Sequence, residues 1–197
     1  FDGFGFKKFY PTELTENQQI TDNTGVYFEC KPNVLLVRLG NSEAFTFNTV
    51  TQKMQRIESL KNVLVFDFFK LDEGHFIASS LNCCYLLDVE LKIKTKICPP
   101  LNNKGVPVNF RRISKTNYLV CSSTEFFEYD VRNKSFKKIP LNIELREEYN
   151  SGFTCLFVEE KRKFFYISNY FTGLYKVDFE GNIVHFWKNG IAHNCIT

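Results

Sequence analysis

One pattern recurs along the chain: an apolar stretch ends in Asp or Asn, a short polar turn follows, and a second alternating stretch carries Lys or aromatic residues. The Asp or Asn stands at positions 2, 48, 88, 130 and 178, so successive copies are 46, 40, 42 and 48 residues apart. A period of about 40 to 50 residues is typical of propeller blades. The repeat therefore favours one repeating architecture over separate domains.

Each repeat divides into four short strands, judged from the alternation of apolar and polar residues and from the polar turns between them. The predicted strands are 63–71, 75–79, 84–89 and 92–98; then 108–114, 118–122, 125–131 and 135–140; then 153–159, 164–168, 174–179 and 183–188. Helical character is confined to 143–149. We therefore predict an all-β fold, a β-propeller of about four blades, each blade a four-stranded antiparallel meander.

The repeat limits predict a single β-propeller segment over 1–197, with repeats at approximately 1–48, 49–88, 89–130 and 131–178. Residues 179–197 then lead into a further blade. Ile20 lies 18 positions after Asp2, and Ile196 lies 18 positions after Asp178, so the chain ends in phase with its start. This phase predicts a fragment of a larger propeller.

The amino-acid composition favours β-strands and does not indicate a class of binding partner. The chain has 22 Phe and 9 Tyr against 1 Met and 1 Trp, and aromatic residues favour strands. With 25 basic and 22 acidic residues, the net charge of +3 is too weak and too dispersed to indicate nucleic acid or a membrane surface. No apolar run reaches the roughly 20 residues of a membrane-spanning helix.

The recurring Asp or Asn has a local explanation. Its short side chain can accept hydrogen bonds from the backbone N–H groups of the turn that follows. We therefore expect a structural role for these residues rather than a ligand role.

Seven cysteines are scattered without a CxxC pair or zinc-ligand spacing. They are Cys30, Cys83, Cys84, Cys98, Cys121, Cys155 and Cys195. Adjacent Cys83 and Cys84 point to opposite faces of a strand, which makes them poor joint ligands. We expect small buried thiols, with a single disulfide as the alternative and no catalytic or metal role.

Basic and aromatic residues supply the remaining candidates for ligand contact. Arg111 and Arg112 alternate on an innermost strand, so one of them could point into the channel and hold an anionic or sugar ligand. The run 161–163 is expected to be a solvated hairpin tip. Three rings, Trp187, Tyr149 and Tyr170, could stack on sugars or simply pack between blades.

No residue is assigned a catalytic, metal-binding or cofactor-binding role, and ligand-binding residues stay unassigned. The histidines, His75, His185 and His193, have no partner at a spacing that suggests a triad or a metal site. GxSxG, HExxH, P-loop and GxGxxG motifs do not occur in the sequence.

The C-terminal part of the chain resembles the two-component regulator propeller repeat. Residues 173–182 read Gly-Leu-Tyr-Lys-Val-Asp-Phe-Glu-Gly-Asn, and 189–196 read Asn-Gly-Ile-Ala-His-Asn-Cys-Ile, as in that family's third strand and its lead into the next blade. The opening Phe-Asp-Gly-Phe of 1–4 is similar to the family's Phe-Asp-Gly-Tyr segment. The middle departs, since the usual Trp-Ile-Gly-Thr second strand is replaced, for example by Phe-Ile-Ala at 76–78.

The resemblance implies a non-catalytic sensor in the extracytoplasmic part of a hybrid histidine kinase, periplasmic, membrane-anchored as a whole and responsive to glycan fragments. Such propellers have about seven blades. The implied partners are an oligosaccharide and adjoining blades, or another copy through open edge strands. Nucleic acid and direct membrane contact by this segment are not expected.

Two alternatives to the sensor function follow from the same sequence. Tyr129-Asp130-Val131-Arg132 also suits a kelch-like intracellular scaffold for protein interactions. A propeller enzyme acting on glycans is disfavoured because the predicted inner strands carry no converging carboxylates.

Overall fold

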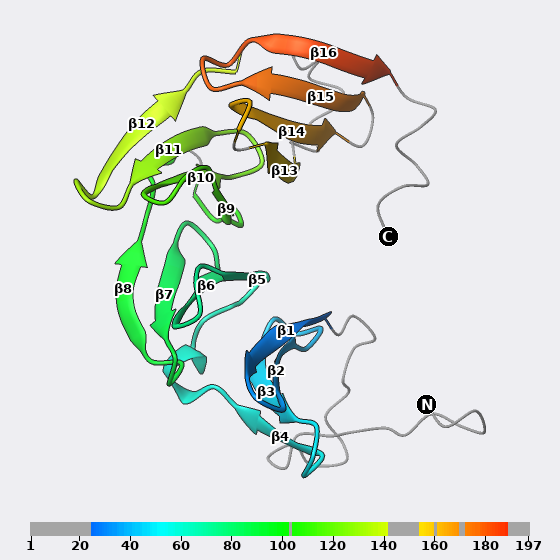
Figure 1. Cartoon of the computed structure of the whole chain (residues 1–197), viewed down its shortest axis with the longest axis vertical. Coiled ribbons are helices and arrows are strands. Elements are labelled where there is room, and N and C mark those ends of the chain that lie inside the picture. Colours follow the sequence, from blue (N-terminus) through cyan, green and yellow to red (C-terminus); the bar gives the residue numbers. More distant parts are fainter. Residues whose placement is uncertain (1–24, 103, 142–153, 160, 170–171, 189–197) are drawn as a thin grey trace. The chain divides into compact units, whose positions relative to one another are not determined.

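The computed structural model describes residues 25–102, 104–141, 154–159, 161–169 and 172–188. These residues form four sheets of four strands each, with one short 3-10 helix, η1, at Glu58–Leu60 (Figure 1). The first sheet contains β1 (Gly25–Lys31), β2 (Val34–Arg38), β3 (Ala44–Asn48) and β4 (Lys53–Arg56). The second sheet contains β5 (Asp67–Lys70), β6 (His75–Ser79), β7 (Cys84–Asp88) and β8 (Ile93–Ile97). The third sheet contains β9 (Asn109–Arg112), β10 (Asn117–Cys121), β11 (Phe126–Asp130) and β12 (Ser135–Ile139). The fourth sheet contains β13 (Thr154–Glu159), β14 (Phe164–Asn169), β15 (Gly173–Asp178) and β16 (Ile183–Lys188).

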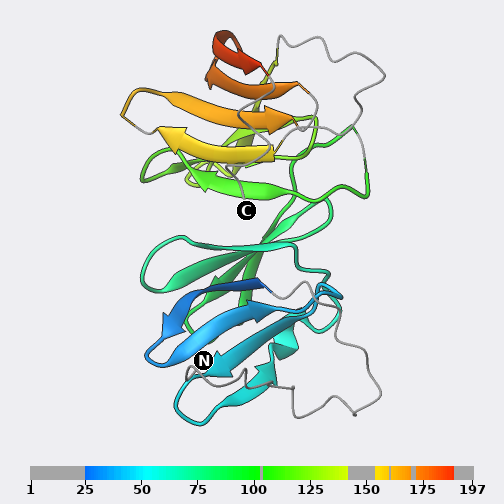
Figure 2. The ribbon, with the colours of Figure 1, turned by 90° about the vertical axis from the view of Figure 1, so that its right-hand side faces the viewer.

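Every sheet is a meander in which the strands follow one another in chain order, and Figure 2 shows this for β13 to β16. The described strand pairs are antiparallel wherever their register is defined, as for β10 and β11. The predicted bounds of β6 and β16 coincide with the structure, and the predicted four-stranded meander is confirmed.

The strand predicted over 63–71 is too long, because only Asp67–Lys70 enters the sheet. The apolar residues before it are held by other backbone partners. The N–H of Val65 donates to the Ser42 carbonyl at 2.8 Å, and the N–H of Val63 donates to the Leu60 carbonyl at 2.9 Å. Val65 is fully buried, so its apolar character reflects core packing outside a strand.

The structural role expected for the recurring Asp or Asn is confirmed in all four described sheets. In each case one side-chain oxygen accepts two backbone N–H groups of the following turn, at 2.8 to 3.2 Å. The four residues are Asn48, Asp88, Asp130 and Asp178. The same turns each contain one residue of positive φ, which are Gln52, Leu91, Lys134 and Gly181. Asp2 lies outside the described residues.

The chain divides into two compact units. One comprises Phe1–Ser80 and Tyr85–Lys96, and its core joins the first two sheets through buried residues such as Leu36 and Phe76. The other comprises Leu81–Cys84 and Ile97–Thr197, and its core joins the last two sheets. There the Phe126 and Phe165 rings stack with centroids 5.7 Å apart, so the surplus of aromatic residues fills the space between sheets.

The expectation of free thiols was wrong for one pair of cysteines, for which the alternative of a single disulfide holds. Cys83, just before β7, and Cys98, just after β8, form a disulfide that closes the hairpin of these two strands. Spacing along the sequence does not reveal this pair, since it depends on which strands lie side by side. Buried thiols are confirmed at Cys30, Cys84 and Cys121, while nothing is described of the side chains of Cys155 and Cys195.

Several predictions concern residues that the structure does not describe. These are the first copy of the repeat near Asp2, the helical turn at 143–149 and the lead segment at 189–196. Among the described residues, no helix has the length and apolar character needed to cross a membrane.

Candidate functional site

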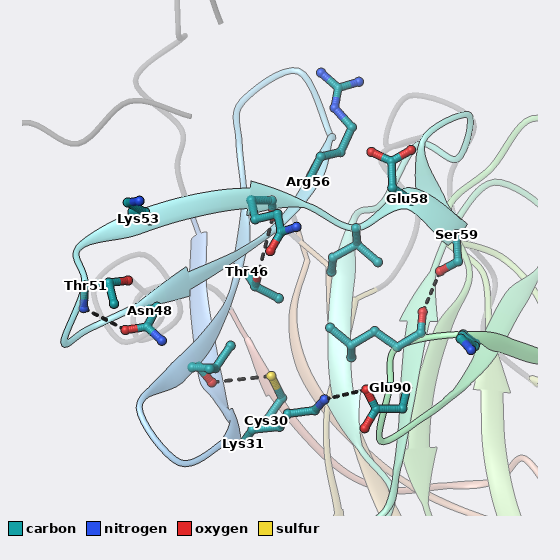
Figure 3. Close-up of a pocket in the computed structure, with 15 residues that line it drawn as sticks. Cys30, Lys31, Thr46, Asn48, Thr51, Lys53, Arg56, Glu58, Ser59 and Glu90 are labelled. Atoms are coloured by element: carbon teal, nitrogen blue, oxygen red, sulfur yellow. Dashed lines mark hydrogen bonds and ion pairs between the residues drawn. The ribbon is translucent and has the colours of Figure 1, made fainter. Parts of the chain in front are cut away.

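A pocket of about 540 Å³ lies in the first unit, between one face of the β1–β4 sheet and the turn that joins β7 to β8 (Figure 3). Its volume falls within the range of small-molecule sites, about 300 to 1,000 Å³. The sheet contributes residues from all four strands, and the opposite side is formed by Glu90, Leu91 and Lys92. The pocket is therefore built from two neighbouring sheets.

The alternation of β3 and β4 supplies a polar floor. Thr46 and Asn48 of β3 point to the same face, and their cross-strand partners are Gln55 and Lys53 of β4. The hydroxyl of Thr46 donates to the Gln55 carbonyl at 3.3 Å, and Asn48 accepts the N–H groups of its turn. Hydroxyl and amide groups on one face suit a ligand with many hydroxyls.

The opposite side of the pocket depends on the repeated Asp. Asp88 accepts the N–H groups of Lys92 at 2.9 Å and Glu90 at 3.0 Å. The hydrogen bond from the Lys92 N–H, together with that from Glu90, holds the pKa of Asp88 below its usual value. The Leu91 carbonyl accepts the hydroxyl of Ser59, which links the turn to η1. The sequence repeat thus fixes one boundary of the pocket.

Charged groups border the pocket, with four basic and two acidic residues among those that line it. Lys31 Nζ lies 2.9 Å from a carboxylate oxygen of Glu90, which bridges the two sheets across the pocket. Arg56 is held by Glu43 at 2.7 Å and extends away from Thr46 in Figure 3. The excess of positive charge favours a neutral or anionic ligand.

Cys30 lies at the pocket without the character of a nucleophile. Its thiol donates to the Val34 carbonyl at 3.3 Å, and burial raises the pKa of the Cys30 thiol. A raised pKa keeps the sulfur protonated at neutral pH, and the thiol is far less reactive than the thiolate. Cys30 is therefore not activated for attack on a substrate.

The two arginines predicted as candidates for ligand contact, Arg111 and Arg112, are not among the residues that line this pocket. On β9, Arg111 donates to the Phe110 carbonyl at 2.9 Å and Arg112 to the Ser114 carbonyl at 3.3 Å. Both are half-buried. The run 161–163 forms an exposed turn between β13 and β14, which confirms the predicted hairpin tip.

The aromatic and histidine candidates are also dispersed. Trp187 packs in the last sheet. The centroid of its ring lies 6.4 Å from that of the stacked Tyr166 ring and 4.2 Å from that of the His185 ring. His75 is exposed, and its Nδ1 lies 2.9 Å from Asp72, three residues earlier. Tyr149, Tyr170 and His193 lie outside the described residues. Within the described ranges, no group of three His, Cys, Asp or Glu residues could hold a metal ion.

The sequence alone did not indicate the pocket. Its residues belong to ordinary strand and turn positions that become neighbours only when two sheets pack. The turn after Asp88 is the one part of the pocket that belongs to a recognisable sequence pattern. Because this turn recurs in every sheet, it indicates a structural hydrogen bond and not a ligand site.

No family model matches the sequence, and no curated protein is significantly similar to it. Solved structures match in fold. The extracellular domain of a putative one-component system from Bacteroides thetaiotaomicron is similar over 89% of this chain and 24% of its own, with a TM-score of 0.65 and 16% identity. A second match is the extracellular domain of a putative hybrid two-component system from the same organism, with 80% and 20% coverage, a TM-score of 0.54 and 11% identity.

A third match is the WD40 domain of Neurospora crassa Pan2, over 83% of this chain and 48% of that chain, with a TM-score of 0.58 and 13% identity. The chain thus spans less than half of each of these structures. At such identities the likeness is one of fold alone. Together with the four meander sheets, it shows that the chain has the fold of a β-propeller fragment.

Proposed function

We propose that this chain is a non-catalytic recognition segment in the extracytoplasmic sensor of a two-component type regulator. The observation that carries the proposal is the fold likeness to extracellular domains of two Bacteroides regulators, one of them over 89% of this chain. The resemblance of residues 173–182 to the two-component regulator propeller repeat supports the same assignment. The periplasm is the location that such a sensor requires.

The disulfide between Cys83 and Cys98 supports this location, because disulfides persist in oxidising compartments and are rare in the cytosol. The likeness to the Pan2 domain favours the second candidate, a scaffold for protein interactions inside a cell. Titration of thiols in the denatured protein, isolated from its native source without reductant, separates the two. We expect two of the 7 cysteines to be unreactive, whereas reaction of all of them would support the intracellular scaffold.

The ligand proposed for the pocket is an oligosaccharide. The polar floor of Thr46, Asn48 and Gln55 offers hydroxyl and amide partners, and Lys92 extends the site onto the second sheet. A ligand that contacts both sheets stabilises one arrangement of them, and a following domain can sense that change. Binding is thereby coupled to signalling without a chemical step.

A thermal-shift screen of the purified chain against neutral and acidic oligosaccharides tests this proposal. We expect one class to raise the unfolding temperature while its chains remain uncleaved when recovered and sized. Cleavage of the glycan would instead support an enzyme.

The binding variant is Thr46→Val, which keeps the shape of the side chain and removes its hydroxyl from the pocket. Its matched control is Thr95→Val on β8, an exposed residue outside the pocket. We expect Thr46→Val alone to reduce the shift. Equal shifts in both variants would place the ligand elsewhere, and the absence of any shift across the screen would count against glycan recognition by this segment.

A further inference from the structure

The outer strand of the last sheet differs from the other outer strands. The fourth strand of each sheet lies at its edge, and β16 lies beside β15 alone among the described strands (Figure 1). The other three outer strands each carry two basic residues, namely Lys53 and Arg56 in β4, Lys94 and Lys96 in β8, and Lys137 and Lys138 in β12. β16 carries only Lys188, at its last position.

Apolar side chains take the place of these charges. Ile183, Val184 and Phe186 of β16 are 41%, 48% and 41% exposed. Among the large apolar residues of the other three outer strands, only Ile93 of β8 is comparably exposed, at 38%. β16 is also the longest of the four, with 6 residues against 4, 5 and 5.

An exposed apolar edge strand is a template for pairing with another strand, and proteins commonly protect such edges with lysines. One protective feature is present, since the register with β15 shifts at Val184. From His185 to Lys188, however, β16 pairs regularly with Gly173–Lys176, so its far side presents a regular row of backbone groups. This edge is at the rim of its sheet, away from the faces on which blades stack.

We propose that β16 pairs with β16 of a second copy of this chain, antiparallel about a two-fold axis near the middle of the strand. This interaction is independent of the ligand proposed above. It commits the chain to a symmetric dimer in which two four-stranded sheets join edge to edge.

Charge favours a second copy of β16 at this edge. Self-pairing of β8 or β12 would bring lysines of two copies together, and like charges across a strand pair are destabilising. Self-pairing of β16 avoids this repulsion. About an axis between His185 and Phe186, Lys188 of each copy lies opposite Ile183 of the other copy, so no two lysines meet. Aromatic and β-branched residues meet in the middle, which are favourable cross-strand pairs.

Sedimentation velocity of the full 197-residue chain, over a range of concentrations, tests the proposal. We expect a monomer–dimer equilibrium. Val184→Lys restores the protection found on the other outer strands and should raise the dimer dissociation constant about tenfold or more. The matched control is Val89→Lys, since Val89 is 43% exposed in the turn between β7 and β8 and lies on no edge. It should leave the constant unchanged.

Hydrogen exchange adds a readout that is independent of the variants. Amides of β16 should gain protection as the concentration rises, while those of β12 should not. Thermal unfolding confirms that both variants fold. The proposal is overturned if the chain stays monomeric throughout, if the two variants behave alike, or if the concentration-dependent protection appears in another strand.

Discussion

Gly181, in the turn between β15 and β16, packs directly against the carbonyl group of Pro140, the residue that follows β12. A Cβ atom at position 181 would overlap the Pro140 oxygen, and Gly181 also has a positive φ of 91°. The last sheet therefore docks on its neighbour through a position that accepts glycine alone.

Gly181→Ala should lower the free energy of unfolding by about 2 to 4 kcal/mol, because the methyl group meets fixed backbone and the positive φ is strained. The control is Gly105→Ala, since Gly105 shares a positive φ of 78° but has open space around its Cβ position. That variant should lose only about 1 kcal/mol. Equal losses in urea unfolding would contradict the close packing on Pro140.

Asp130 should make stability depend on pH. Hydrogen bonds from the N–H groups of Asn133 and Arg132 hold the pKa of Asp130 below its usual value. A carboxyl whose folded-state pKa is lowered stabilises fully above its unfolded pKa and loses that contribution as pH falls through the folded pKa. We therefore expect the free energy of unfolding to fall between about pH 5 and about pH 3.

The control for this pH dependence exists in the chain, since Asn48 occupies the corresponding position in the first sheet and accepts the same kind of turn hydrogen bonds. The Asp130→Asn variant should therefore fold, and its free energy of unfolding should depend less steeply on pH than that of the unchanged protein. An identical acid dependence in both would show that Asp130 contributes none of it.

The disulfide between Cys83 and Cys98 closes a loop of 15 residues, which corresponds to about 3 kcal/mol of unfolded-state entropy. Cys98→Ser should therefore lower the free energy of unfolding by about 2 to 3 kcal/mol. Reductant should lower the free energy of unfolding of the unchanged protein by a similar amount and should not change that of the Cys98→Ser variant. Insensitivity of the unchanged protein to reductant would mean that the bond is absent.

Glu125 is buried and accepts the backbone N–H of Asn102 at 2.7 Å, the Asn102 side chain at 2.9 Å and Lys138 Nζ at 2.9 Å. Glu125→Gln should lower the free energy of unfolding by about 1 to 3 kcal/mol, because an amide N–H₂ cannot accept these donors. The contrasting variant is Glu90→Gln, whose exposed ion pair with Lys31 should contribute less than about 1 kcal/mol. Chemical denaturation measures both, and equal effects would contradict the buried role.

Local features of the sequence predicted the fold. Alternation predicted β6 and β16 with correct bounds, because side-chain direction in a strand depends only on neighbouring residues. Asp130 and its counterparts were assigned correctly, since a turn hydrogen bond spans only a few positions. The apolar run at 63–66 misled the prediction, because Val65 bonds to Ser42 rather than to a strand.

Tertiary structure alone decided the rest. The pocket joins Gln55 to Lys92, the disulfide joins Cys83 to Cys98, and Gly181 meets Pro140, each across a distance in sequence that no local pattern encodes. Propensity, alternation and turn chemistry act over a few residues, so the repeated four-stranded meander can be predicted from the sequence. Which side chains meet depends on how the sheets pack, because each sheet buries one face against another.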